Sequence, residues 1–337
     1  MSALAAPTSL GLGVYRVAVP TPFLVGDTNV YLLDDDPLTL VDAGPAWVPS
    51  LRALERGLGL LGHRVEDLEL ILVTHQHMDH VGLVETLVDR SGALVACLDL
   101  LVPFVRCFGA GARRDDDLML ALMRRHGVPE DAVAALVPFM AVKRSFGSSF
   151  VVDRALSQGE VIELRDRRLR VLHRPGHSPS DTIFHDESHD VAFGGDHLLA
   201  NVSSNAVISA SLSDGVVTTG VLARERSLVT YLDSLTATRA LGLREIFAGH
   251  GPTVTAHRRL IDERVGHHRE RAARIRALIR EEPLSAHQIA VRLWGREATP
   301  QAHLTLSEVL GHVDLLIAAG EVDEQLVDER VVFVARS

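Results

Sequence analysis

The sequence predicts an α/β protein with a helical insertion and a small C-terminal domain. Short β-rich runs alternate with helical patterns along most of the chain, residues 99–150 hold only helical patterns, and the composition changes after residue 264. A chain of 337 residues is also long enough for one full core and a smaller second domain. We therefore expect a main domain over residues 1–264 and a second domain over residues 265–337.

Composition and charge exclude several classes of protein. Hydrophobic residues make up 47% and charged residues 23% of the chain, which is typical of a soluble globular protein. The formal net charge of -10 disfavours a general nucleic-acid binder, because phosphate contacts need a basic face. The only cysteines, Cys97 and Cys107, lack the spacing of a thiolate metal site. With no signal peptide and no apolar run long enough to span a bilayer, we expect a cytoplasmic protein that does not contact a membrane.

The first part of the chain predicts an antiparallel meander followed by a helix. Three β-rich runs, at residues 15–19, 29–33 and 38–41, are separated by Pro, Gly and Asp turn signals. Residues 48–61 then carry leucines at helical spacing. Asp42 ends the third predicted strand, where it either orients a metal ligand or caps a turn, and the sequence leaves both roles open.

The most informative stretch, Thr-His-Gln-His-Met-Asp-His, follows a strand predicted over residues 68–73. Its four metal-capable side chains are His75, His77, Asp79 and His80. Side chains alternate along a strand, so the first two histidines should lie on the same side of the loop that leaves it. A helix predicted over residues 81–88 places the aspartate and the last histidine in or beside its first turn. Two ligand pairs in different directions suit two adjacent metal ions better than a set of solvent-facing histidines.

After a strand over residues 93–97, residues 99–150 interrupt the alternation of strands and helices. Helical patterns over residues 100–108, 115–126 and 129–140 predict three helices, and the segment is too long for a connecting loop. Its large apolar side chains either line a substrate pocket as a lid or pack the insertion onto the main domain. These side chains are Phe104, Phe108, Met119, Met123, Phe139, Met140 and Phe146.

Two further motifs present single metal-capable side chains at the ends of strands. Strands over residues 161–164 and 169–173 lead to Pro-Gly-His-Ser, a tight turn that presents His177. A strand over residues 190–193 leads to Gly-Gly-Asp-His, which contains Asp196.

The last motif follows a long loop and a helix. Residues 198–220 are rich in Ser, Asn and Gly, and they predict a loop that faces the substrate. A helix over residues 224–241 and a strand over residues 246–248 precede Gly-His-Gly, which presents His250. Four nearby histidines are interpreted as ordinary polar contacts: His173, His185, His189 and His197.

The C-terminal domain is predicted to consist of three helices and a hairpin, as in a winged-helix module. The helices cover residues 258–280, 286–294 and 304–319, and the hairpin covers residues 321–334. Residues 265–337 contain nine Arg, no Lys and eleven Asp or Glu, so their net charge is 9 - 11 = -2. Without a basic recognition helix, docking or dimerisation is favoured over DNA binding.

One helix of this domain has more apolar residues than a single narrow stripe needs. They are Leu304, Leu306, Val309, Leu310, Val313, Leu315 and Leu316. We therefore expect a homodimer with the C-terminal domain at or near the interface.

In order and context, these motifs resemble the metal site of the metallo-β-lactamase fold superfamily. The resemblance covers residues 15–264 and rests on THxHxDH, PGHS, GGD and GHG taken together. It implies an αββα sandwich with the metals at one edge of the two sheets. The implied ligands are His75, His77 and His177 for the first ion, Asp79, His80 and His250 for the second, and Asp196 as the bridge. The C-terminal module resembles the winged-helix domain of a branch that includes endoribonucleases and thioesterase-like enzymes.

This ligand set favours catalysis with two divalent metal ions. Three or four N and O ligands leave each ion an open position, and with no cysteine ligand zinc is favoured over iron or manganese. A hydroxide that bridges the ions would attack a carbonyl carbon or a phosphorus, and Asp79 or a metal-bound water would pass the proton to the leaving group.

The leading hypothesis is a hydrolase of a small-molecule thioester, ester or lactone. The complete ligand set, the apolar insertion and the acidic composition support it. The alternative is a metal-dependent endoribonuclease or phosphodiesterase, supported by the winged helix and by the arginines of residues 258–280. Those arginines alternate with Glu, which is also typical of a solvated helix face. A binding protein that has kept the fold is disfavoured by the intact ligand set. We expect a small-molecule substrate and no tight binding of nucleic acid.

Overall fold

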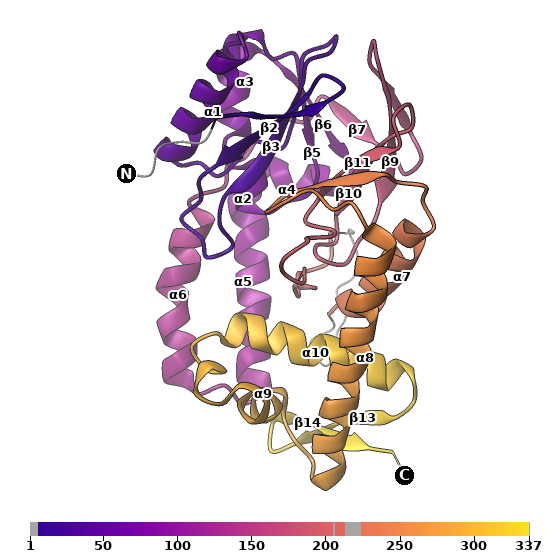
Figure 1. The fold of residues 1–337 in the computed structure, drawn as a ribbon. Coiled ribbons are helices and arrows are strands. Elements are labelled where there is room, and N and C mark those ends of the chain that lie inside the picture. The colour runs from indigo at the N-terminus through magenta and orange to yellow at the C-terminus, as the bar shows by residue number, and fades with distance from the viewer. Residues whose placement is uncertain (1–5, 205, 213–223, 337) are drawn as a thin grey trace.

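A computed structural model describes residues 6–204, 206–212 and 224–336 of the chain. Figure 1 shows two β-sheets at one end of the molecule with helices on their outer faces, and a mostly helical part at the other end. The order helix, sheet, sheet, helix that the resemblance implies is therefore observed.

The first sheet has seven strands, of which the first four pair antiparallel and the last four pair parallel. In spatial order they are β1 (Thr8–Gly11), β2 (Val14–Val19), β3 (Thr28–Leu33), β4 (Thr39–Val41), β5 (Leu70–Val73), β6 (Leu94–Leu98) and β7 (Arg154–Leu156). The predicted meander corresponds to β2, β3 and β4. Every residue of β5 is buried, as expected for a parallel strand that is covered on both faces. α1 (Val48–Leu60) and α3 (Val84–Ser91) pack against the outer face of this sheet.

The second sheet has five strands and faces the first. In spatial order they are β12 (Glu245–Ala248), β11 (Val191–Gly195), β10 (Thr182–Asp186), β9 (Arg168–His173) and β8 (Val161–Glu163). The rings of Tyr31, Phe193 and Phe247 lie between the sheets with centroids 5.4 to 5.7 Å apart. α7 (Ser227–Arg239) packs on the outer face of the second sheet.

Three strands were not predicted, and one predicted helix is divided in two. β1, β7 and β10 were not predicted, and the helix predicted over residues 81–88 is divided into α2 (Met78–Val81) and α3. At the division, a Cβ on Gly82 would lie 2.1 Å from the carbonyl oxygen of Phe146. Only glycine therefore allows the insertion to approach the end of α2 this closely.

The insertion contains the three predicted helices with shifted boundaries. They are α4 (Val102–Arg106), α5 (Phe108–Arg125) and α6 (Glu130–Arg144). α5 begins at Phe108 rather than near residue 115. Figure 1 shows α5 running from the sheets toward the helical part of the molecule, with α6 beside it.

The C-terminal elements follow in the predicted order of helices and hairpin. They are α8 (His257–Glu281), α9 (Ala286–Trp294), α10 (Ala302–Ala318), β13 (Val322–Val327) and β14 (Arg330–Ala335). Because α8 continues across residue 264, the predicted domain boundary falls inside a helix and not at a linker. The identity of the module as a winged helix stays a prediction.

The insertion and the C-terminal elements share one apolar core. Met119, Met123 and Met140 are buried in a cluster that also contains residues of α8, α9, α10 and the hairpin. Phe104 and Phe108 are buried in the cluster beneath the first sheet. For these five residues the packing interpretation is therefore confirmed.

Most of the apolar residues of α10 that suggested a dimer are used within the chain. Leu306, Val309, Leu310, Val313 and Leu316 are buried in the shared core. Leu315 packs against the cluster beneath α7, and Leu304 is 40% exposed. The homodimer stays a prediction, and it no longer has this support. Among the described residues, no helix is long and apolar enough to cross a membrane.

Candidate metal centre

The seven predicted ligands converge where strands of both sheets end. His75 and His77 follow β5, and Asp79 and His80 belong to α2. The remaining three are His177 in the loop between β9 and β10, Asp196 directly after β11, and His250 after β12. The structure brings all seven side chains together in three overlapping groups.

The first group consists of His75, His77 and His177, whose possible ligand atoms all lie within 4.8 Å of one another. His77 Nδ1 lies 3.2 Å from His75 Nε2 and 2.9 Å from His177 Nε2. Two nitrogens that bind one tetrahedral zinc ion lie about 3.3 Å apart, given bonds of about 2.05 Å. The spacing of these imidazoles therefore fits one shared ion.

The second group consists of Asp79, His80 and His250. His250 Nε2 lies 3.4 Å from Asp79 Oδ2, which again fits ligands of one ion. Asp196 lies between the groups, with Oδ2 3.5 Å from both His177 Nε2 and His250 Nε2. Its Oδ1 lies 3.5 Å from His80 Nε2. Asp196 is therefore positioned to reach two adjacent ions.

Buried atoms without partners support the presence of a bound cation. Within the described part of the chain, His80 Nε2, His250 Nε2 and Asp196 Oδ1 are buried and have no hydrogen-bond partner. A buried polar atom left unsatisfied costs about 1–3 kcal/mol. Metal ions would satisfy all three atoms, so this donor set fits the divalent metals that the resemblance implies.

Asp42 contacts His80, one of the predicted ligands, as the first of its two predicted roles requires. Its Oδ2 lies 2.8 Å from His80 Nδ1, and its Oδ1 accepts the backbone N–H of Thr74 at 2.9 Å. With the imidazole proton on Nδ1 and directed at Asp42, the lone pair of His80 Nε2 faces the centre.

His250 is oriented by residues that sequence reasoning missed. Its Nδ1 lies 2.8 Å from the carbonyl oxygen of Asp27, so Nε2 faces the centre. The side chains of Asn29 and Tyr31 both donate to the carbonyl oxygen of Ala248, at 2.8 and 2.6 Å. These contacts join β3 to the end of β12, directly before the loop that carries His250. No local pattern around Asn29 or Tyr31 signals them.

Burial and neighbouring charges set the protonation of the cluster. The pKa of His75 lies well below its usual value because the ring is buried, and the nearby His80 and His77 lower it further. Burial and His177 also lower the pKa of His77. Both rings are therefore neutral at pH 7, which is the form that binds metal. Burial would lower the pKa of His80 as well, but the carboxylates of Asp196 and Asp42 outweigh it and raise this pKa.

The four histidines that were set aside lie outside the three ligand groups. His197 Nε2 lies 2.9 Å from Thr238 Oγ1, and His173 Nε2 lies 2.9 Å from the carbonyl oxygen of Pro179. His189 contacts a carboxylate away from the centre, and burial lowers the pKa of His185.

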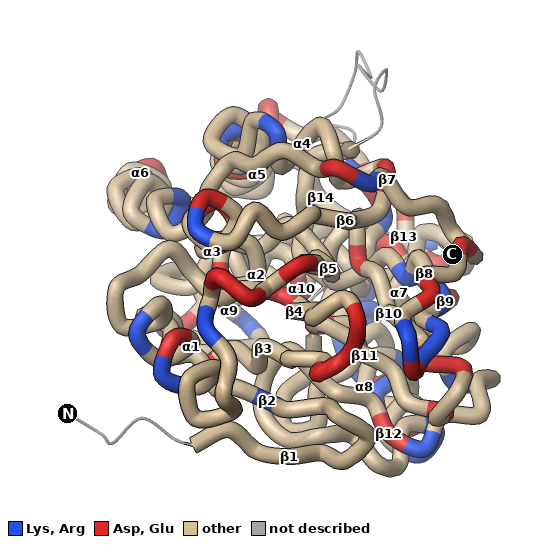
Figure 2. The backbone as a smooth tube through the Cα atoms, turned by 90° about the horizontal axis from the view of Figure 1, so that it is seen from above, with Lys and Arg blue, Asp and Glu red and all other residues tan. Residues whose placement is uncertain are grey.

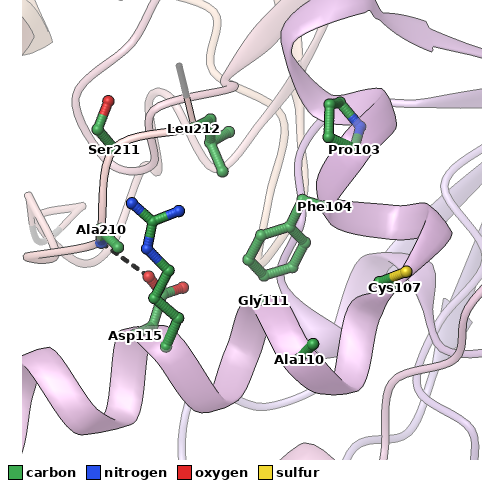
Figure 3. A pocket seen from close by; sticks show the side chains of 10 residues that line it. Pro103, Phe104, Cys107, Ala110, Gly111, Asp115, Ala210, Ser211 and Leu212 are labelled. Carbon is green, nitrogen blue, oxygen red and sulfur yellow. Dashed lines mark hydrogen bonds between the residues drawn. The ribbon is translucent and has the colours of Figure 1, made fainter. Parts of the chain in front are cut away.

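The described part of the predicted loop over residues 198–220 connects the centre to a hollow beside α4 and α5. Val207 N–H donates to the carbonyl oxygen of His177 at 3.3 Å, and Ala210 N–H donates to Asp115 Oδ1 at 2.7 Å. The hollow has a volume of about 240 Å³ (Figure 3). Apolar residues form most of its wall: Pro103, Phe104, Ala110, Gly111, Ala210 and Leu212. Residues 205 and 213–220 of the predicted loop lie outside the described residues.

Comparison with known proteins agrees with this geometry. The chain is 32% identical over 305 residues to a probable metallo-hydrolase of Bacillus subtilis, covering 90% of this chain and 92% of that protein. A solved structure of a metallo-beta-lactamase family protein from Thermus thermophilus has a TM-score of 0.80 at 28% identity, covering 97% of this chain and all of that one.

Two shorter matches are to enzymes with stated substrates. An acyl-coenzyme A thioesterase of Gallus gallus is 39% identical over 64 residues, which are 19% of this chain and 23% of that protein. A hydroxyacylglutathione hydrolase of Haemophilus influenzae is 29% identical over 140 residues, which are 40% of this chain and 54% of that protein. The family model of the metallo-beta-lactamase superfamily matches residues 24–250, so this chain belongs to that superfamily of metal-dependent hydrolases.

Proposed function

We propose that this protein hydrolyses a small-molecule thioester at a centre of two divalent metal ions. The observation that carries the proposal is the seven-residue cluster, in which two groups of three ligands share Asp196. The ions, with zinc favoured over iron or manganese, would be held by His75, His77 and His177, by Asp79, His80 and His250, and by Asp196. When bound, they supply a polarised substrate carbonyl and a water that ionises near neutral pH.

The protein's own groups orient the ligands and transfer the proton. Asp42 and the Asp27 carbonyl group fix the rings of His80 and His250. Burial alone would raise the pKa of Asp79, but His250 and His80 bring it below the usual value, so the side chain is a carboxylate at neutral pH. The other carboxylate oxygen of Asp79, Oδ1, would take a proton from the attacking water and pass it to the leaving group, while Oδ2 faces His250.

Two relatives support a thioester as the substrate. The names of these relatives, an acyl-coenzyme A thioesterase and a hydroxyacylglutathione hydrolase, both denote enzymes that cleave a carbonyl–sulfur bond. A thiol has a pKa of about 8.5 and leaves more easily than an alcohol. A thioester therefore needs less proton transfer at the leaving group than an ester or a lactone.

The arginines of α8 give little support to the nuclease alternative. Arg258 and Arg264 donate to backbone carbonyl groups, and Arg276 pairs with Glu321. Arg271 lies over the ring of Trp294. Figure 2 shows basic residues spread over many elements with acidic residues among them. A phosphate backbone needs a continuous basic face, so a small-molecule substrate is favoured.

Substrate screening of the zinc-loaded protein tests this proposal. The panel contains an acyl-coenzyme A, a hydroxyacylglutathione, a matched ester, a lactone and single-stranded RNA. We expect fastest turnover of a thioester, and its loss in His177→Ala. Turnover of RNA alone, or of no thioester, would overturn the proposal.

A further inference from the structure

Lys143 is the only lysine in the chain, and it lies in the last turn of α6. It is half-buried, and it makes no ion pair within residues 6–204, 206–212 and 224–336. The neighbouring Arg144 does pair, with Asp116 on α5. Arg144 thereby offsets the charge of Asp116, and the Lys143 ammonium keeps its charge available for a ligand.

The end of α6 is fixed against the helix that carries Asp79 and His80. The Phe146 carbonyl oxygen accepts the backbone N–H of Ala46 at 2.7 Å and closely approaches Gly82, directly after α2. Ser148 Oγ donates to the carbonyl oxygen of Val81 at 3.4 Å. Lys143 lies one turn before Phe146, so its backbone is held near the end of α2, the helix that carries Asp79 and His80.

The side chain of Lys143 belongs to the face of α6 that looks toward the start of α10. Phe139 and Lys143 are four residues apart and therefore share one face of the helix. The ring of Phe139 is 50% exposed, and its centroid lies 6.0 Å from that of His303 on α10. Met140 belongs to the buried face. After burial, the Lys143 charge is the next cause of the lowered pKa of His303, so the ammonium is within electrostatic reach of the start of α10.

We propose that Lys143 binds a carboxylate or phosphate on the thiol half of the substrate and so selects anionic thioesters. This inference rests on the proposed function. The metal centre would take the reacting carbonyl group, and the Lys143 ammonium would contact the charged remainder. Coenzyme A carries phosphates and glutathione carries carboxylates, so both thiols offer the required charge. In a protein with a formal net charge of -10, an unpaired cation beside the site is the feature that would attract such a group.

Binding of inert thioethers to the metal-loaded full chain tests this inference without requiring turnover. Calorimetry compares S-ethyl-coenzyme A, S-ethylglutathione and the neutral S-ethyl-N-acetylcysteamine. Lys143→Met removes the charge, and Lys143→Arg keeps it. Arg113→Met is the matched control, because Arg113 is exposed on the same insertion and makes no ion pair in the described part of the chain.

We expect one charged thioether to bind the wild type about tenfold more tightly than the neutral one, as for a partly exposed charge-assisted hydrogen bond. Preferred binding of S-ethyl-coenzyme A would indicate that Lys143 binds a phosphate, and preferred binding of S-ethylglutathione would indicate a carboxylate. The preference should vanish in Lys143→Met and persist in Lys143→Arg and Arg113→Met. Equal affinity of the wild type for all three probes, or an unchanged preference in Lys143→Met, would overturn the inference.

Hydrolysis of the corresponding thioesters, measured in parallel, separates the two proposals. Charge preference in binding without turnover of any thioester would contradict the proposed function alone. Turnover of charged and neutral thioesters with the same KM would contradict the role of Lys143 alone.

Discussion

Replacing Asp42 by Asn tests whether this carboxylate sets the orientation of His80. Asp42 is 2% exposed, and its two oxygens contact His80 Nδ1 at 2.8 Å and Thr74 N at 2.9 Å. A carboxylate accepts at both oxygens, whereas an amide has one acceptor and one donor group. If the NH2 group of the asparagine faces His80, Nδ1 must accept a hydrogen bond, and the imidazole proton must move to Nε2. If the NH2 group faces Thr74 instead, it points at the backbone N–H of Thr74, and neither donor has an acceptor.

Either orientation weakens the metal centre. The first removes the Nε2 lone pair that would bind the ion, and the second leaves a buried donor unpaired at about 1–3 kcal/mol. Loss of such an orienting partner typically lowers metal affinity about 10–100-fold, or about 1.4–2.7 kcal/mol. We therefore expect the more weakly bound of the two zinc ions to bind Asp42→Asn with about 10–100-fold lower affinity than it binds the wild type.

Zinc titration in competition with a chromophoric chelator measures this affinity. Asp186→Asn is the control, because Asp186 is a buried carboxylate whose Oδ2 contacts a histidine outside the centre, the partly exposed His189, at 2.9 Å. Unchanged zinc affinity in Asp42→Asn, or an equal loss in Asp186→Asn, would show that Asp42 does not orient His80 for metal binding.

Three further predictions concern the centre, a buried acid and the shared core. His177→Ala and Asp196→Ala should each lower turnover by about 100-fold or more while circular dichroism stays native, and full turnover in both would mean that the assignment is wrong. Burial raises the pKa of Asp115 to about 7 from its usual 3.8. Between pH 4 and 7 the folded chain therefore holds a proton that the unfolded chain has lost, and the free energy of unfolding falls as the pH rises through this range. Asp115→Asn should therefore be more stable than wild type by about 2–4 kcal/mol at pH 8 but not at pH 4, and a pH-independent difference in thermal unfolding would contradict this. Truncation after Gly266 should give an unfolded or aggregated chain, because it exposes the apolar residues of α5 and α6, and a folded fragment that binds metal would disprove the shared core.

The sequence allowed the ligand cluster to be predicted because its signals are local. His75, His77, Asp79 and His80 lie within six residues, and each remaining ligand lies in a short turn at the end of a strand. The longer helices were predicted for the same reason, since their apolar periodicity is visible within a few turns. β10 was missed because Thr182–Asp186 contains polar residues, and its pairing with β9 and β11 completes it as a strand.

Contacts between distant segments required the structure. The hydrogen bond from Asn29 to Ala248 at the end of β12 joins residues 219 positions apart, and nothing near Asn29 indicates its partner. The surplus of apolar residues on α10 was read from the sequence, but it suggested a partner subunit. Their partners are instead α5, α8 and α9 of the same chain. A count of apolar residues predicts how much of a helix is buried, but it does not identify the elements that pack against it.

We propose that the seven side chains of the candidate metal centre hold two metal ions, and the metal content of the purified protein measures this number. Elemental analysis of metal-replete wild type should give about two ions per chain, because seven ligands exceed what one tetrahedral ion uses. The double variant His80→Ala with His250→Ala, which keeps the first group of ligands, should give about one. One ion or none in the wild type would contradict the account.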